Sequence, residues 1–257
     1  MKIILSPAKQ MKTADDDLAY RDLPILIDQA QELLDHLRNL DEASLQKMWN
    51  CSDRIAQQNI GRLREMDLHG RLSPALFSYT GLAYQHMTPG AMTEKQLEYL
   101  QEHLFILSGF YGILRPFDGI TPYRLEMQSI LPGIGDLYGF WKDRLYRAVT
   151  EEDHVIINLA SKEYADAVAP FLKEDDRMIQ IVFGTLQNGK VIQKGTLAKM
   201  SRGEMVYWIA ENRIEEPEEL KKFNAGCAYS EEYSSADTWV YLYTDTGENH
   251  GRKKRNR

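Results

Sequence analysis

The chain has 257 residues, of which 43% are apolar and 27% charged, a composition typical of a globular protein with a substantial core. No apolar run approaches the roughly 18 residues of a transmembrane helix, and the apolar start at residues 3–5 is too short for a signal peptide. Two cysteines exclude a disulfide framework and a thiolate-cluster metal site. We therefore expect a cytoplasmic protein without a membrane association.

The formal net charge of -7 argues against nucleic-acid affinity spread over the whole surface. Five basic residues are concentrated in the last six positions, 252–257, so the rest of the chain is more acidic still. We interpret residues 247–257 as a basic, disordered tail, with contact to phosphates as the alternative. Any basic functional surface in residues 1–246, which we expect to form one domain, must be local.

Helical and strand patterns alternate along the chain. Apolar and β-branched runs predict strands at 2–5, 74–79, 104–107, 155–159, 178–183, 190–193 and 238–243. Helical spacing predicts helices at 24–38, 44–49, 52–65, 93–103, 162–169, 196–209 and 217–223. The fold class is therefore α/β in the mixed, α+β sense: one compact domain with a mixed central sheet, surrounding helices and a basic cleft at strand ends.

Local signals fix several element boundaries. Thr93 and Gln96 form a capping-box pattern at the start of a helix, and Asn188-Gly189 is a strong hairpin signal. Segments 78–84 and 107–112 both place glycine and tyrosine after a predicted strand. We interpret this repeated pattern as two neighbouring strands whose carboxyl ends lie at the same edge of the sheet. Ligands bind at such edges in open α/β sheets. Chance similarity of the two segments is the alternative.

Segment 107–127, LSGFYGILRPFDGITPYRLEM, is unusually rich in special residues. Its glycines and prolines shape tight turns that carry Arg115 and Arg124, with Asp118 and Glu126 beside them. A buried strand that opens into such a loop presents charge to a ligand. The alternative is a structural loop in which each arginine pairs with its neighbouring carboxylate.

Basic residues recur near the ends of predicted elements. The set comprises Lys9, Arg115, Arg124, Lys162, Lys199, Arg202 and Arg213. If these ends converge, they form a basic cleft suited to a phosphate backbone or a nucleotide, with arginine giving bidentate contacts. Taken singly, each residue is more typical of a surface ion pair.

Other motifs are less informative about function. Residues 131–135, LPGIG, resemble the turn of a helix-hairpin-helix element, but the turn-rich sequence before them favours a structural loop. The six histidines have no paired metal-ligand spacing, so we expect no metal site and no cofactor. Phosphate-binding, dinucleotide and nucleophile-elbow motifs are absent from the sequence.

Several longer motifs occur in a fixed order: SPAK at 6–9, YTG at 79–81, LSGFYGILRPFD at 107–118, PYRLEM at 122–127, LYGFW at 137–141, NLASKEY at 158–164, RG at 202–203 and NRI at 212–214. In this the chain resembles the YaaA family of bacterial peroxide stress resistance proteins from residue 2 to about 245. The resemblance implies a cytoplasmic protein that limits free intracellular iron and so protects DNA. It also implies a single α/β domain with a positively charged, DNA-binding cleft.

With this resemblance, further residues are expected to support the cleft: Ser6, Tyr79, Gly81, Gly109, Tyr111, Asp118, Glu126, Ser161 and Glu163. The favoured hypothesis is a non-catalytic protein that binds double-stranded or distorted DNA, without an obligate protein partner. The alternative is a nucleic-acid or nucleotide-processing enzyme with base-excision or lyase-like chemistry, in which Lys9 forms a Schiff base. No catalytic residue carries over from the family, and direct iron sequestration is disfavoured.

Overall fold

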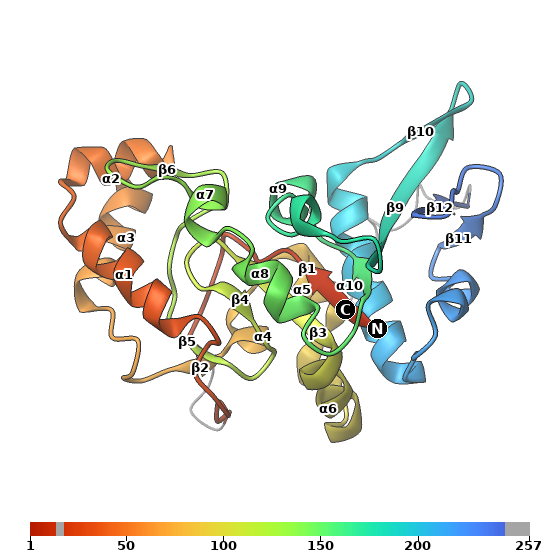
Figure 1. The fold of residues 1–257 in the computed structure, drawn as a ribbon, viewed down its shortest axis with the longest axis horizontal. Helices are drawn as coiled ribbons and strands as arrows, with labels where there is room; N and C mark the ends of the chain where they lie inside the picture. The colour runs from red at the N-terminus through yellow and green to blue at the C-terminus, as the bar shows by residue number, and fades with distance from the viewer. Residues whose placement is uncertain (14–17, 245–257) are drawn as a thin grey trace, which may run out of the picture.

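The computed structural model describes residues 1–13 and 18–244. The strands of its main sheet are β1 (Lys2–Leu5), β3 (Leu104–Ser108), β4 (Gly112–Leu114), β8 (Val155–Asn158), β9 (Arg177–Gln187), β10 (Lys190–Ile192), β11 (Cys227–Ser230) and β12 (Thr238–Tyr243). Their order is β11-β12-β9-β8-β1-β3-β4, and β10 pairs with β9 outside this path (Figure 1). Two small ribbons pair β2 (Ser73–Pro74) with β5 (Gly119–Ile120) and β6 (Ile130–Leu131) with β7 (Gly135–Asp136).

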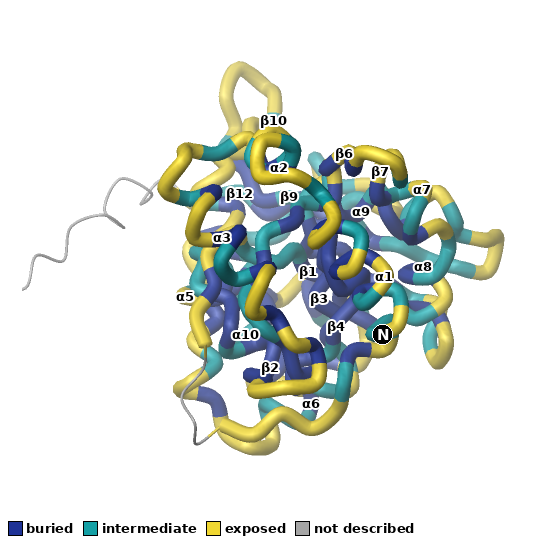
Figure 2. The backbone as a smooth tube through the Cα atoms, turned by 90° about the vertical axis from the view of Figure 1, so that its left-hand side faces the viewer, coloured by how far each residue is buried: buried dark blue, intermediate teal, exposed yellow. Residues whose placement is uncertain are grey.

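The centre of the sheet is parallel. Strand β1 lies between β3 and β8 and runs parallel to both, while β4, β10 and β11 join antiparallel. Ile3, Ile4 and Leu5 are at most 1% exposed, as expected for a strand covered on both faces. Figure 2 shows β1 and β3 within the buried interior. The predicted mixed sheet in a single domain is confirmed.

Helices and turns surround the sheet. The α-helices are α1 (Ile27–Arg38), α2 (Glu42–Trp49), α3 (Asp53–Glu65), α4 (Ala75–Ser78), α5 (Leu82–Met87), α6 (Glu94–His103), α7 (Leu137–Trp141), α8 (Arg144–Val149), α9 (Lys162–Ala165) and α10 (Gly195–Asn212). Short 3-10 turns are η1 (Pro89–Ala91), η2 (Ala169–Phe171) and η3 (Pro217–Lys222). Helices α1 to α3 group at one end of the molecule, and the β9–β10 hairpin projects at the other (Figure 1). No helix in the described ranges is long and apolar enough to cross a membrane.

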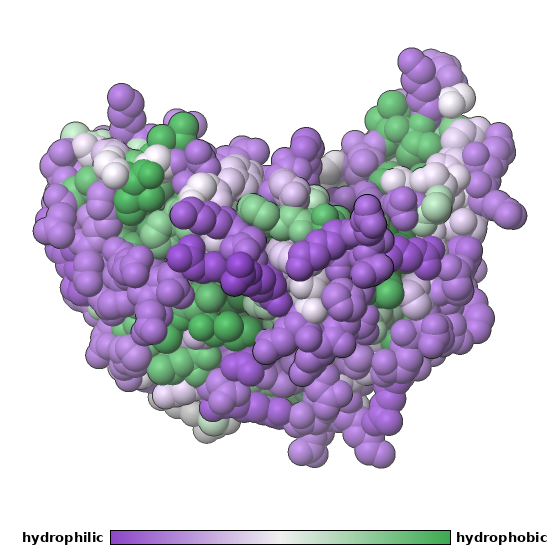
Figure 3. Space-filling view, viewed as in Figure 1, coloured by the Kyte–Doolittle hydropathy of each residue, from purple (hydrophilic) through white to green (hydrophobic). Residues whose placement is uncertain are grey.

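Helix α10 packs closely on α5. A Cβ atom at Gly203 would lie 1.9 Å from the backbone oxygen of Ala83, so only glycine permits this approach. The face of the molecule in Figure 3 is mainly hydrophilic, with apolar side chains in small separate patches. Leu186 and Ile192 of the β9–β10 hairpin are exposed apolar residues.

Most local signals act as expected. Thr93 and Gln96 form the full capping box at α6, and Asn188 and Gly189 adopt the positive φ values of a hairpin turn. Segment 107–127 contains the end of β3, then β4, β5 and the turns between them. Strand β5 pairs with β2, and the segment then enters the loop 121–129.

The predicted strand at 74–79 is wrong. Pro74 belongs to the two-residue strand β2, the next four residues form α4, and Tyr79 is extended but makes only an isolated bridge to Met11. The backbone amides of Ala75 and Leu76 donate to the carbonyls of Asp118 and Pro116, so a loop distant in the sequence holds this turn. The repeated pattern in 78–84 and 107–112 therefore does not mark two neighbouring strands.

Candidate functional site

The carboxyl ends of β1 and β8 open into a pocket of about 350 Å³. Its lining comes from the last residue of β1 and the segment after it (5–10), residues 81–84 at the start of α5, residues 123–126, four residues of 159–164 and two residues of α10. The chain passes from β1 to β3 on one side and later returns to β8 on the other. Such a switch point leaves a crevice at the carboxyl ends of the strands, where α/β folds bind ligands.

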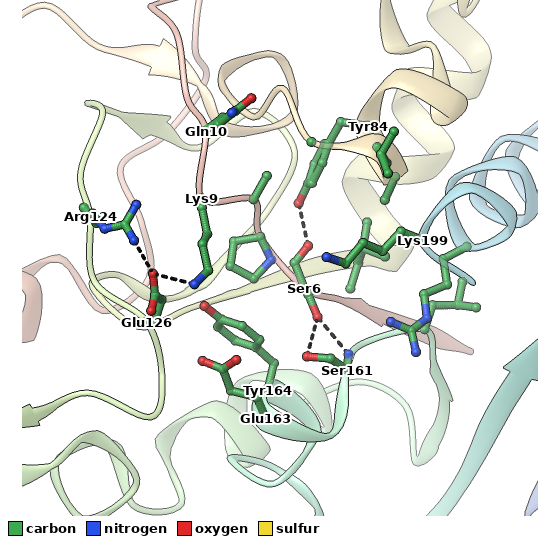
Figure 4. A pocket seen from close by; sticks show the side chains of 18 of the residues that line it. Ser6, Lys9, Gln10, Tyr84, Arg124, Glu126, Ser161, Glu163, Tyr164 and Lys199 are labelled. Atoms are coloured by element: carbon green, nitrogen blue, oxygen red, sulfur yellow. Dashed lines mark hydrogen bonds and ion pairs between the residues drawn. The ribbon is translucent and has the colours of Figure 1, made fainter. Parts of the chain in front are cut away.

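Two serines tie the strand ends together. The Ser6 Oγ accepts a hydrogen bond from the Ser161 amide at 2.8 Å and donates to the Ser161 Oγ at 3.2 Å (Figure 4). The Tyr84 hydroxyl donates to the Ser6 carbonyl at 2.9 Å. A Cβ at Gly81 would lie 2.6 Å from Ala8, so this glycine lets the two loops meet. These contacts hold the pocket floor in place.

On one side of the pocket, two cations share a carboxylate. The Glu126 Oε1 lies 3.1 Å from the Lys9 Nζ and 3.2 Å from an Arg124 guanidinium nitrogen (Figure 4). These are ion pairs without hydrogen-bond geometry, because the buried Oε1 of Glu126 and Nε of Arg124 have no hydrogen-bond partner. Lys9 is 65% exposed and Arg124 only 15%. The single negative charge of Glu126 therefore balances only one of the two positive charges beside it.

On the other side, α10 supplies Lys199 and Arg202, which are three residues apart and so share one helix face. Within the described ranges, no carboxylate lies within ion-pair distance of either side chain. The buried Nε of Arg202 has no hydrogen-bond partner, and burial lowers the pKa of its guanidinium. This pair of cations is uncompensated within the part of the chain that the structure describes.

A buried polar cluster positions segment 123–126. The Tyr123 hydroxyl lies 2.9 Å from that of Tyr79 and 2.7 Å from the Ser108 Oγ. Burial raises the pKa of Tyr123 to about 12 and that of Tyr79 well above its usual value, so both phenols stay neutral. A Cβ at Gly109 would lie 2.6 Å from the Leu125 carbonyl, so Gly109 permits this close approach.

The sequence-predicted residues therefore divide into groups. Four of the seven cations line the pocket: Lys9, Arg124, Lys199 and Arg202. Five expected supporting residues line it with them: Ser6, Gly81, Glu126, Ser161 and Glu163. Tyr79 and Gly109 lie behind it, and the buried Tyr111 hydroxyl, in the turn between β3 and β4, accepts a hydrogen bond at 3.1 Å from the Thr121 amide, which follows β5. Whether these residues bind DNA stays a prediction.

Arg115 and Asp118 form a separate unit. Arg115 donates to Asp118 through its backbone amide at 2.8 Å and its Nε at 3.0 Å, and its guanidinium also lies 3.4 Å from Asp22. Asp118 is fully buried, and burial raises its pKa to about 6. Neither residue lines the pocket. The structure places both in a closed turn, as in the alternative interpretation of this loop.

Lys162 and Arg213 also lie away from the pocket lining. The exposed Lys162 ammonium pairs with Asp166 one helical turn on, at 2.7 Å, whereas its neighbour Glu163 faces the pocket. Arg213 is the left-handed C-cap of α10, about 16 Å beyond Arg202 at 1.5 Å per residue. Both residues lie near the end of a helix in the sequence, but the fold does not bring their side chains to the pocket at the strand ends.

The LPGIG segment is a β-hairpin. Ile130–Leu131 pairs with Gly135–Asp136, and Gly133 and Gly135 adopt positive φ at the turn. The structural interpretation of this segment is confirmed, because a helix-hairpin-helix turn needs a helix on each side. In the described part of the chain, no group of three or more His, Cys, Asp or Glu residues could hold a metal ion.

Sequence reasoning missed the four other polar residues of the pocket lining: Gln10, Tyr84, Tyr123 and Tyr164. Tyr123 and Tyr164 stand directly beside Arg124 and Glu163, which were singled out. The position of these two tyrosines, next to charged residues in segments that follow strands, was the available signal.

Comparison with known proteins gives the family of this chain. Residues 1–233 match the family described as peroxide stress protein YaaA, which confirms the resemblance inferred from the motifs. A UPF0246 protein of Pediococcus pentosaceus is 48% identical over 245 residues, which cover 94% of this chain and 98% of that protein. UPF0246 proteins of Agathobacter rectalis and Limosilactobacillus reuteri are 47% and 46% identical over the same shares. The family description supports a role in the peroxide response, and the chain belongs to the YaaA family of peroxide stress proteins.

Proposed function

We propose that this chain protects DNA during peroxide stress by binding its phosphates at the strand-end pocket, in the cytoplasm. The observation that carries the proposal is the convergence of Lys9, Arg124, Lys199 and Arg202 on one pocket of an acidic protein. Four cations against the two carboxylates of Glu126 and Glu163 leave the pocket with an excess of positive charge, and a concave site attracts the opposite charge more strongly than the same charges dispersed over a surface. Phosphates are the anions that DNA presents to proteins.

The α10 pair should contribute most. Lys9 and Arg124 already interact with Glu126, whereas Lys199 and Arg202 have no carboxylate within ion-pair distance in the described ranges. The buried Nε of Arg202 has no hydrogen-bond partner, and its guanidinium gains charge-assisted hydrogen bonds when a phosphate arrives. A bound phosphate therefore supplies the negative charge that the described residues do not provide beside Lys199 and Arg202.

The test is fluorescence anisotropy with a labelled DNA duplex over a range of salt concentrations. The double variant Lys199→Ala, Arg202→Ala should lose at least about tenfold in affinity, and its salt slope should fall by about two. Lys162→Ala is the matched control, because it removes an exposed lysine outside the pocket. Unchanged affinity and slope in the double variant would overturn the assignment.

We also propose that the chain limits free intracellular iron, as its family resemblance implies. Chelatable iron in whole cells should rise in a strain without the gene, as measured by electron paramagnetic resonance after peroxide exposure. Complementation with the wild-type chain should restore the level, and the double variant should not. Full restoration by the double variant would separate the iron effect from the pocket.

A second candidate function is lyase-like chemistry on damaged DNA, and it is favoured by the place of Lys9 in the pocket beside Glu126. The lysine amine would attack the aldehyde carbon of an abasic sugar and release water to leave an imine. Borohydride would reduce that imine to a stable protein–DNA adduct. An adduct that disappears in Lys9→Ala supports this candidate; no adduct, or one that persists, contradicts it.

A further inference from the structure

The volume of the pocket limits what can enter it. About 350 Å³ lies at the lower end of the range for small-ligand sites and is too small for a length of duplex. A DNA strand can reach the interior of such a pocket only if one nucleotide leaves the base stack and turns into it. Phosphates of a stacked duplex would touch only the rim.

The pocket also has two chemically different ends. Figure 4 shows Lys199 on one side of Ser6, with Glu126 and Glu163 on the other. The Lys199 end is cationic and uncompensated within the described ranges, as Arg202 also lines it. At the opposite end the Glu163 carboxylate accepts one long hydrogen bond, from the Gln128 amide at 3.4 Å, and keeps acceptor capacity free.

Carbon-rich side chains form a third part of the lining. Pro7, Leu125 and Tyr164 line the pocket, and Tyr164 is a neutral phenol because burial raises its pKa well above the usual value. Aromatic and aliphatic walls accept the flat faces of a base without reading its identity. A ligand that fits all three features has an anionic group, a flat apolar body and an N–H donor.

We propose that the pocket receives one unstacked nucleotide of a DNA strand, with its phosphate at Lys199 and Arg202 and its base toward Glu163. The inference rests on the proposed function and names the part of DNA that enters. A carboxylate accepts but does not donate hydrogen bonds, and the single ring N–H of thymine is flanked by two carbonyl oxygens that repel a carboxylate, so Glu163 favours bases with an exocyclic amine over thymine. Adenine, cytosine and guanine carry that amine.

The experiment uses a duplex with a single bulged 2-aminopurine, a fluorescent base with an exocyclic amine whose emission rises when it unstacks. Anisotropy on the same sample reports binding. Wild-type protein should raise the emission about threefold at saturation, and Lys199→Ala with Arg202→Ala should remove both signals. Glu163→Ala should reduce the emission change while duplex affinity stays within about twofold. Lys162→Ala, one residue away on α9, should change neither.

A second readout is base preference. Wild-type protein should bind a bulged adenine about threefold more tightly than a bulged thymine, and Glu163→Ala should remove this difference. DNA binding without an emission change, or an equal preference for both bulges, overturns the inference and leaves the proposed function standing. Absence of any DNA binding overturns both. Free deoxynucleoside monophosphate that binds more tightly than DNA would assign the pocket to a free nucleotide instead.

Discussion

The two arginine turns of segment 107–127 look alike in sequence and differ in the fold. Arg115 precedes Asp118 by three residues, and Arg124 precedes Glu126 by two. Asp118 is fully buried and receives both backbone and side-chain donors of Arg115. Glu126 is 27% exposed, lines the pocket and is shared between Arg124 and Lys9. The first pair closes a turn, while the second leaves charge available to a ligand.

The difference shows that an arginine beside a carboxylate carries little information about function by itself. What decides is whether the carboxylate forms hydrogen bonds with the arginine. Asp118 accepts hydrogen bonds from the backbone amide and the Nε of Arg115, whereas the Arg124 turn leaves a buried Nε without a hydrogen-bond partner. Substitutions in the two turns should therefore affect different quantities.

The largest expected effect is on stability, from Arg115→Ala. Removing one partner of a buried ion pair leaves Asp118 uncompensated, so the free energy of unfolding should fall by about 3 kcal/mol at neutral pH. Urea denaturation measures this loss. DNA affinity of the folded variant should match that of the wild type. A stable variant with weakened DNA binding would place Arg115 in the binding surface and erase the contrast between the turns.

The next effect concerns the pH dependence that Asp118 confers. Its pKa is raised from the usual 3.8 to about 6 by burial, so the native state holds its proton more tightly than the unfolded chain. The stabilising contribution is complete below pH 4 and is lost as the pH rises through 6. Between pH 4 and 7, the advantage in unfolding free energy of the wild type over Asp118→Asn should shrink by about 2 kcal/mol.

Carboxyl NMR gives an independent reading of the same group in the folded wild type. The Asp118 signal should titrate with a midpoint of about 6. A midpoint at or below 3.8 would mean that the attraction of Arg115 exceeds the cost of burial. In that case the ion pair with Arg115 would stabilise the charged form of Asp118 by more than burial destabilises it.

A smaller effect is expected from Arg124→Ala, this time on binding. DNA affinity should fall about fivefold and the salt slope by about one, because one phosphate contact is lost. The unfolding free energy should change less than in Arg115→Ala, since Glu126 remains partly exposed and keeps Lys9 as a partner. Anisotropy and urea denaturation on the same preparation compare the two quantities. The reverse pattern would mean that Arg124 is structural.

The smallest effect should come from Lys9→Ala. This ammonium is 65% exposed and already paired with Glu126, so its loss should weaken DNA binding by about twofold. The measurement is the same salt-dependent anisotropy. A loss as large as that of the α10 double variant would move the centre of the binding surface from Lys199 and Arg202 to the Glu126 side.

Much of the fold could be predicted from local patterns. The strands at 2–5, 104–107 and 155–159, the α6 capping box and the Asn188-Gly189 turn follow from short-range sequence signals. The failure at 74–79 has a non-local cause, because Ala75 and Leu76 donate to carbonyls some 40 residues away in the chain. Hydrogen bonds of this kind leave no trace in a local pattern of apolar residues.

The site divides in the same way. The sequence by itself determined which residues are charged, that strands end beside them and, through the motif order, the family. Only the tertiary structure decided that Lys199 and Arg202 meet Ser6 and Ser161 at one pocket while Lys162, Arg115 and Arg213 do not. The physical reason is that compensation of a charge depends on which partners come within a few ångströms of it and how far water is excluded, and the fold sets both.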